Sequence, residues 1–291
     1  MADVASTSVQ KSKKIEDIPS RVMLWNEEEA ALKQIEQVGV SACGATAALN
    51  VLGVLGITAE VPDVVKAVRT RLRDLEAPLP KYLLSRSVAG TTHTDIIDGI
   101  KEISNGNVTG RFFNFYPERD VDICLWLKTW LLRGGIPVAT LNCQKVPYPD
   151  GTIPDAWHHQ MIWGVSEDGF HAANPCLIIP EKELMTQLCS ESVLLIRRSD
   201  VLERWDVNMD ETPIETNDWA RLQVKQQIER IIKEEMLKIL YGNELKYNGM
   251  TTSHVVIPAA YKSGITIFVK KGSIASECLD TELEIPIKNK S

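Results

Sequence analysis

Long apolar runs are absent from this sequence. No stretch of its 291 residues approaches the roughly 18 consecutive apolar residues that cross a bilayer, and residues 1–8 lack the apolar core of a secretory signal. Cysteine is also sparse, with six residues scattered along the chain and not in the dense spacing of a disulfide framework. We therefore expect no membrane segment, reduced cysteines and a cytoplasmic protein.

Several short motifs with a known chemistry are missing as well. The sequence has no CxxC or HExxH spacing for zinc, no Walker-type glycine loop for nucleotides and no repeat of roughly 20 to 50 residues. Its net charge of −7 argues against binding to a phosphate backbone. What remains, 44% hydrophobic and 24% charged residues, is typical of a globular protein with a substantial core. We expect no cofactor, no metal and no nucleic-acid partner.

One segment near the N-terminus is a candidate for chemistry. Gln37 lies six residues ahead of Cys43, and Cys43 opens an apolar run, residues 45–55, that predicts a helix. The start of a helix gathers unpaired N–H groups and the positive end of the helix dipole, which lower the pKa of a thiol and favour the thiolate. The Gln37 amide can then donate to the oxyanion that forms when the thiolate attacks a carbonyl. The competing interpretation is that Cys43 is a small buried apolar residue.

A second segment lies far downstream. Residues 157–165 predict a strand that starts at a histidine pair, and residues 166–169 predict a turn ending in Asp-Gly. Residues 170–173 return as a second strand that stops at Asn174. A hairpin of this length brings its two ends together, so a histidine at its start lies near Asn174. A cysteine thiolate, an imidazole base and an orienting amide are the cysteine version of the catalytic triad.

These motifs resemble the papain-like cysteine peptidases, and most closely the peptidases that process bacteriocin leaders and are often attached to ABC transporters. That family shares Gln-x-x-x-x-x-Cys-Gly on an apolar helix, a Gly-x-Pro-apolar strand similar to residues 134–141, and a histidine strand, turn and second strand ending in Asp-Pro or Asn-Pro. The resemblance covers about residues 30–200. It implies catalytic roles for Gln37, Cys43, a histidine and Asn174, and a peptide or protein substrate. Because no transporter segment follows, we expect a stand-alone soluble member.

Two neighbouring histidines compete for the role of base. In the family the base lies six positions before the strand glycine, here Gly164, and sixteen before the Asp or Asn, and both counts select His158. Adjacent strand residues face opposite sides of a sheet, so only one of His158 and His159 can face Cys43, and a one-residue slip in register would make it His159. A zinc site built from Cys143, His158 and His159 is a further alternative that no ligand spacing supports.

The order of the predicted elements indicates an α+β protein. Strand patterns dominate from residue 136 to 197, after an extended segment at 107–116. Helical patterns dominate before that, at residues 27–37, 43–55, 61–72, 94–103 and 118–133. An N-terminal helical lobe that contains the cysteine helix and a C-terminal antiparallel β-sheet lobe match the two lobes of a papain-like fold, with the site between them.

We divide the chain into three parts. Residues 1–22 are polar and lysine-bearing, and we expect them to be disordered. Residues 23–200 form the expected peptidase domain. Residues 201–291 are an extension with a predicted helix at 218–241 and strands at 255–257 and 264–269. This extension packs on the core, recognises substrate or binds a protein partner.

The sequence therefore predicts a cysteine peptidase that works through a thioester intermediate. Cys43 is the nucleophile, His158 the base and then the acid, and Asn174 the residue that aligns the imidazole. Gln37 and the backbone N–H of Cys43 are the expected oxyanion donors. Two alternatives use the same residues: a catalytically inactive peptidase-like module that binds a peptide or partner, and an acyl or peptidyl transferase with an amine acceptor in place of water.

Overall fold

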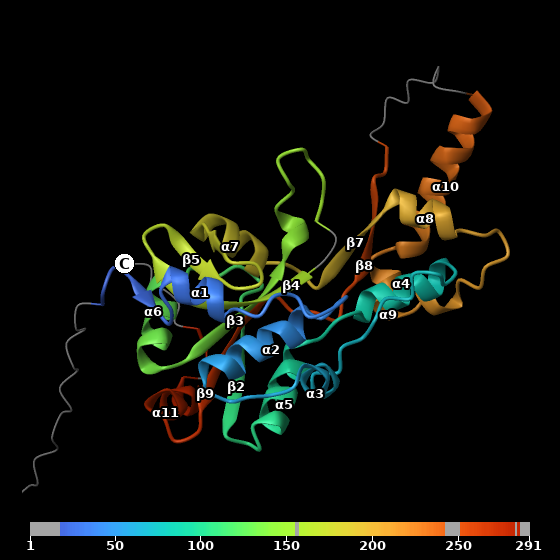
Figure 1. Ribbon diagram of the computed structural model, residues 1–291. Helices are drawn as coiled ribbons and strands as arrows, with labels where there is room; N and C mark the ends of the chain where they lie inside the picture. Colours follow the sequence, from blue (N-terminus) through green and yellow to red (C-terminus); the bar gives the residue numbers. More distant parts are fainter. Residues whose placement is uncertain (1–17, 155–156, 242–250, 283, 286–291) are drawn as a thin grey trace, which may run out of the picture.

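An antiparallel sheet with helices on both faces forms the body of the protein (Figure 1). The computed structural model describes residues 18–154, 157–241, 251–282 and 284–285. Within these ranges the strands are β1 (Val22–Met23), β2 (Val108–Asn114), β3 (Ile136–Asn142), β4 (Trp157–Ser166), β5 (Gly169–Ala172), β6 (Leu177–Ile179), β7 (Val193–Arg197), β8 (His254–Pro258) and β9 (Gly264–Lys270).

The helices begin and end at recognisable local signals. Asn26 and Thr92 each form a capping box at the start of a helix, and Gly134, with φ of 89°, ends another. The α-helices of the described residues are α1 (Glu27–Lys33), α2 (Cys43–Val54), α3 (Val61–Ala67), α4 (Leu79–Val88), α5 (His93–Ile103), α6 (Ile123–Arg133), α7 (Glu181–Leu188), α8 (Arg198–Arg204), α9 (Asn217–Arg221), α10 (Val224–Tyr241) and α11 (Ile274–Thr281), with short 3-10 helices η1 (Cys143–Lys145) and η2 (Thr212–Ile214). None of these helices is long and apolar enough to span a membrane.

Strands that are distant in the sequence are neighbours in the sheet. The order is β2-β9-β3-β4-β5-β6, with β1 paired to β4, and every pair is antiparallel. β9 lies between β2 and β3 and pairs with β2 along its whole length. β4 pairs with β3 through its first half, and with β5 and β1 through its second half. The start of β4, at Trp157 and His158, therefore lies beside the end of β3.

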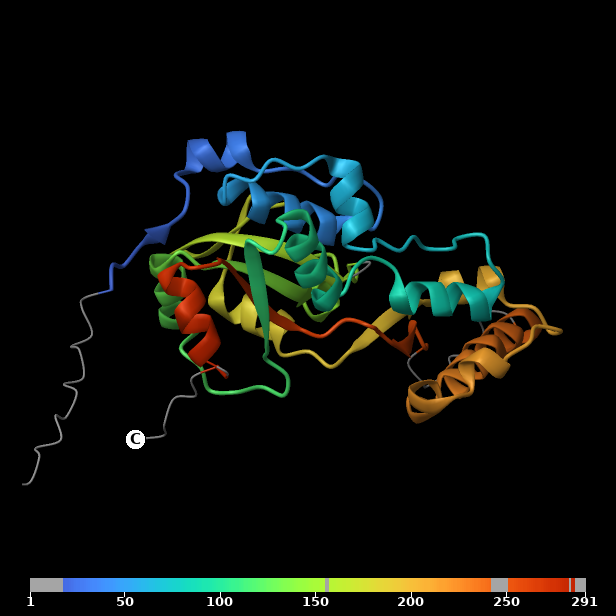
Figure 2. The same cartoon turned by 90° about the horizontal axis from the view of Figure 1, so that it is seen from below.

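Each face of the sheet buries its own hydrophobic core. On one face, α2, α3 and α5 pack against side chains that include Val138, Met161 and Phe268. On the other face, α6, α7 and α11 pack against side chains that include Leu141 and Ile267. Alternate residues of β3 and β9 thus supply the two cores, as the period of two of a strand requires. Figure 2 shows α2 (blue) lying along one side of the sheet, where this packing fixes it against β4.

A third hydrophobic core lies beside the main sheet and forms what we call the wing. The wing consists of α4, the paired strands β7 and β8, and helices α8, α9 and α10. Its buried residues include Tyr82 from α4 and Ile228 from α10. Trp157 at the start of β4 and Tyr261 between β8 and β9 belong to the same core. The wing therefore meets the main sheet at the start of β4.

The chain is α+β, as its sequence predicts, and the differences concern single helices. The helix expected over residues 61–72 ends at Ala67, and Arg69 then adopts a left-handed conformation with φ of 52°. The helix expected over residues 218–241 is divided into α9 and α10 at Gln223, which has φ of 54°. α7 lies where strand patterns dominate, and α4 has no counterpart among the predicted helices. A left-handed residue other than glycine has no strong sequence signal, which explains the two early breaks.

The segment beyond residue 200 contributes to the main sheet. β9, from the expected extension 201–291, hydrogen-bonds to β2 and β3, and α11 packs on the same sheet. At the other end of the chain, residues 1–17 of the expected disordered segment lie outside the described residues, and Val22 pairs with β4 as part of β1. The sheet is therefore incomplete without residues from both ends of the chain.

Removal of residues 201–291 is expected to unfold the protein. Ile265, Ile267 and Phe268 of β9 are fully buried, and loss of even one large buried side chain costs about 2–5 kcal/mol. The 1–200 fragment is expected to lose the cooperative thermal transition seen by circular dichroism, whereas a chain shortened only to residue 285 keeps it. A cooperative transition in the 1–200 fragment would contradict this role of β9.

Candidate active site

Cys43 is the first residue of α2, and no side chain caps this helix end. The cap position is Ala42, whose side chain offers no acceptor, and Ser41 before it has a left-handed φ of 57° that turns the chain into the helix. No acidic residue lies in the first turn to offset the helix dipole. The first N–H groups of α2 therefore remain available at the buried Cys43 thiol, where they stabilise negative charge.

Two side chains of α2 fasten the preceding chain along the helix. The Asn50 amide hydrogen-bonds to both the N–H and the carbonyl of Ile35, at 2.9 and 3.0 Å. The Thr46 hydroxyl accepts the N–H of Val38 at 3.2 Å. Since these contacts flank Gln37, they hold it beside the first turn of α2.

The His158 ring contacts the Cys43 thiol. Burial alone raises the pKa of Cys43, but its hydrogen bond and attraction to His158, together with the backbone N–H groups of His159 and Gly44, lower it below the ordinary value for a thiol. Burial also lowers the pKa of His158, but the Cys43 contact and the Asn174 carbonyl outweigh this effect and raise it above the ordinary value for histidine. The opposite shifts favour a thiolate–imidazolium pair.

Asn174 orients the His158 ring through its backbone. Its carbonyl oxygen accepts a 2.7 Å hydrogen bond from Nε2 of His158, which directs the other ring nitrogen, Nδ1, toward Cys43. The Asn174 side-chain amide instead donates to Gln37 at 3.0 Å, and the Gln37 nitrogen donates to the Gly39 carbonyl at 2.9 Å. The sequence predicts that His158 and Asn174 meet, but it does not predict that the backbone carbonyl makes the contact.

Two glutamines that the sequence alone does not single out also hold Asn174. Gln34 accepts the backbone N–H of Asn174 at 3.2 Å, and Gln160 donates to its carbonyl at 3.2 Å. Gln160 lies two residues after His158 on β4, so the two side chains share a face of the strand, and this spacing is the signal present in the sequence. Together with Gln37, these residues fix the N–H, the carbonyl and the side chain of Asn174.

His159 points away from the thiol and into the core. Its Nε2 donates to the Thr91 carbonyl at 2.7 Å, and its Nδ1 bonds to the Thr140 hydroxyl at 3.1 Å. Burial lowers the pKa of His159 to about 4, so the ring is neutral at neutral pH. Among the residues that the structure describes, no three His, Cys, Asp or Glu side chains gather as a metal site. Within the described ranges, Cys143, His158 and His159 therefore do not gather as the ligands of a zinc site.

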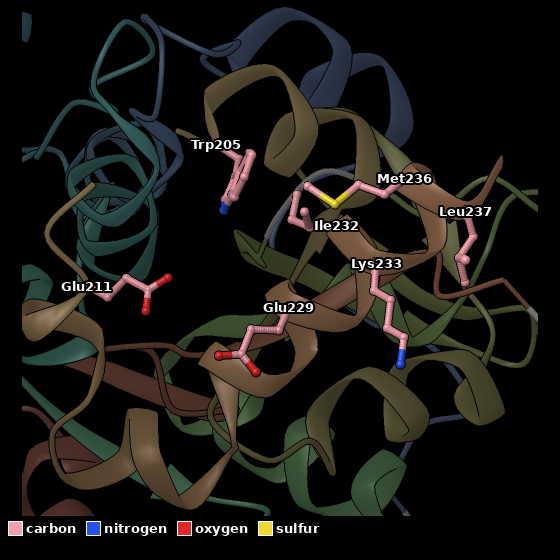
Figure 3. Close-up of a pocket in the computed structure, with 7 residues that line it drawn as sticks. All are labelled: Trp205, Glu211, Glu229, Ile232, Lys233, Met236 and Leu237. Atoms are coloured by element: carbon pink, nitrogen blue, oxygen red, sulfur yellow. The ribbon is translucent and has the colours of Figure 1, made fainter. Parts of the chain in front are cut away.

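A cavity of about 300 Å³ lies elsewhere, on the wing beside α10 (Figure 3). It is lined by Trp205, Glu211, Glu229, Ile232, Lys233, Met236 and Leu237. None of these residues belongs to the cysteine–histidine site, and none is a thiol or an imidazole. The thiol chemistry that the sequence predicts therefore belongs to the site around Cys43, and this cavity has no part in it.

Comparisons with known proteins give only a distant likeness. No known protein family and no curated protein matches the sequence. Among solved structures, the chain is similar to a protein from Bacillus anthracis that is provisionally described as a C39-like peptidase. The sequence identity is 15% and the TM-score 0.40, over 58% of this chain and 92% of that one. A likeness of this degree decides nothing about activity, so function rests on the side chains around Cys43.

The pKa directions predict which thiol reacts first. Cys176 is exposed, but burial of its sulfur and the charge of Glu36 raise its pKa, whereas the pKa of the buried Cys43 is lowered. Because the thiolate is the reactive form, iodoacetamide at about pH 6 is expected to alkylate Cys43 faster than Cys176, as measured by peptide mapping with mass spectrometry.

The variant His158→Asn tests whether the imidazole causes the faster alkylation of Cys43. Without the imidazole, burial raises the pKa of Cys43, so its alkylation at about pH 6 is expected to fall and to recover only at more alkaline pH. Faster alkylation of Cys176 in the unmodified protein would show that Cys43 is not activated.

Proposed function

We propose that the protein is a cysteine peptidase of the papain-like type, similar to the peptidases that process bacteriocin leaders. The observation that supports this proposal is the contact between Cys43, at the uncapped start of α2, and His158, whose ring the Asn174 carbonyl orients. A cysteine that serves only packing needs neither an imidazole partner nor a lowered pKa. The same combination weighs against an inactive binding module, since binding alone needs no thiolate.

The first half of the proposed reaction forms a thioester. The Cys43 thiolate attacks the carbonyl carbon of the scissile peptide bond, and the carbonyl oxygen becomes an oxyanion. The backbone N–H of Cys43 and the second side-chain N–H of Gln37 are the proposed donors to this oxyanion, because the first N–H of Gln37 is bound to Gly39. The C–N bond then breaks as the His158 imidazolium gives its proton to the leaving amine.

The second half releases the acid. His158, now neutral, takes a proton from water as the water oxygen adds to the thioester carbonyl. Expulsion of the Cys43 thiolate breaks the C–S bond and gives the carboxylic acid, and the proton on His158 restores the starting ion pair. Through both halves the Asn174 carbonyl keeps the ring in place and stabilises its charged form.

Replacement of Cys43 by alanine is expected to abolish peptide cleavage, because the nucleophile is lost. Cleavage is measured by mass spectrometry of a peptide library, with and without an added amine. Cys143→Ala is the control and is expected to retain activity, since burial raises the pKa of Cys143 to about 12 and keeps it a thiol. Cleavage by the Cys43→Ala protein at an unchanged rate would reject the proposed nucleophile, and amide products formed only with the amine would indicate a transferase.

Replacement of Gln37 by alanine is expected to lower kcat by about 10²–10³-fold with little change in KM, because an oxyanion donor acts on the transition state. Steady-state kinetics on the best peptide from the library measure this effect. Glu36→Gln, at the exposed neighbouring position, is expected to leave kcat unchanged. An intact kcat in Gln37→Ala would remove Gln37 from the mechanism.

A further inference from the structure

Tyr261 brings the segment between β8 and β9 to the candidate active site. Its ring stacks on Trp157, with centroids 5.7 Å apart and planes 16° apart, and lies 6.0 Å from the His159 ring. Trp157 directly precedes His158 on β4. Only 8% of the Tyr261 surface is exposed, so packing fixes the direction of the side chain.

The hydroxyl end of Tyr261 lies near the start of α2. It is so close to Gly90 that a Cβ at position 90 would collide with it, and the same Cβ would be 3.5 Å from the carbonyl oxygen of Ser41. Ser41 lies two residues before Cys43, and the charge of Cys43 acts on Tyr261. The hydroxyl end of the Tyr261 ring therefore points toward the start of α2, near Cys43.

No hydrogen bond joins this hydroxyl to another residue in the part of the chain that the structure describes, and the hydroxyl is not among the fully buried polar atoms there that lack a partner. The hydroxyl oxygen therefore keeps contact with solvent, where a ligand can reach it, while packing holds the ring. Burial, followed by the charge of Cys43, raises the pKa of Tyr261 against the opposing charges of Arg73, Arg71 and Arg86. The group therefore stays protonated at neutral pH and can donate a hydrogen bond to a ligand that replaces water there.

We propose that the Tyr261 hydroxyl binds the substrate peptide by donating a hydrogen bond to a backbone carbonyl next to the scissile bond. This inference rests on the proposed peptidase function. An extended peptide offers one carbonyl acceptor per residue, so a fixed donor near Cys43 favours a peptide over a small electrophile of equal reactivity. Tyr261 is then a substrate-positioning residue, and the reactivity of the Cys43 thiol does not depend on its hydroxyl.

Tyr261→Phe tests this role, because phenylalanine keeps the stacking on Trp157 and removes only the donor. Two reagents alkylate Cys43: iodoacetamide, which has no peptide chain, and acetyl-Gly-Gly chloromethyl ketone, which presents backbone carbonyls without side chains. The second-order rate constant for the peptidyl reagent is expected to fall about three- to tenfold in Tyr261→Phe, the usual effect of one lost hydrogen bond. The rate constant for iodoacetamide is expected to stay unchanged.

Tyr241→Phe, at the exposed end of α10, is the matched control and is expected to leave both rate constants unchanged. Both are measured by mass spectrometry of the alkylated Cys43 peptide. Equal peptidyl rates in Tyr261→Phe and the unmodified protein overturn the role of Tyr261 and leave the proposed peptidase in place. An equal fall with both reagents overturns it too, since the hydroxyl would then act on the thiol. A Cys43 that reacts with neither reagent in the unmodified protein overturns the proposed function, and the role of Tyr261 with it.

Discussion

The contact between the Cys43 thiol and the His158 ring is the constraint on which the candidate site depends. Both groups are buried deeply enough that burial alone opposes their charged forms. Each favours the charged form of the other, with help from the backbone N–H groups of His159 and Gly44 and the Asn174 carbonyl, so the pair depends on the position of α2 along β4. The packing of α2 on the sheet supplies that position, with side chains such as Val138 and Met161 from β3 and β4. The packing of the hydrophobic core thus holds the Cys43 thiol and the His158 ring in contact.

Much of this site follows from local patterns in the sequence. Cys43 opens an apolar helix, and the two strands around an Asp-Gly turn bring His158 to Asn174. Alternation of strand faces lets only one of His158 and His159 face Cys43, and the spacing of the resembled family selects His158. The structure brings the ring of His158, not that of His159, to the thiol. The cysteine helix and the hairpin are predictable because each depends on residues close together in the chain, whereas the meeting of Cys43 and His158 is expected only from the family resemblance.

The remaining features depend on contacts between distant segments. The Asn174 carbonyl orients His158, and a backbone carbonyl is present at every position, so no residue type marks it in the sequence. Gln34 and Tyr261 reach the site from segments whose own patterns describe only a helix end and a loop. The strand at residues 264–269 is recognisable in the sequence, but its place between β2 and β3 is not, because β patterning specifies a strand and not its neighbours.

The central place of β9 also bears on the order of events during synthesis. A ribosome releases the chain from its N-terminus, so Cys43 and His158 emerge long before the strand that holds β2 and β3 together. Until that strand emerges, the growing polypeptide lacks the finished sheet against which α2 positions Cys43. The arrangement of residues around Cys43 is therefore completed late in the emergence of these segments, only after β9 has joined β2 to β3.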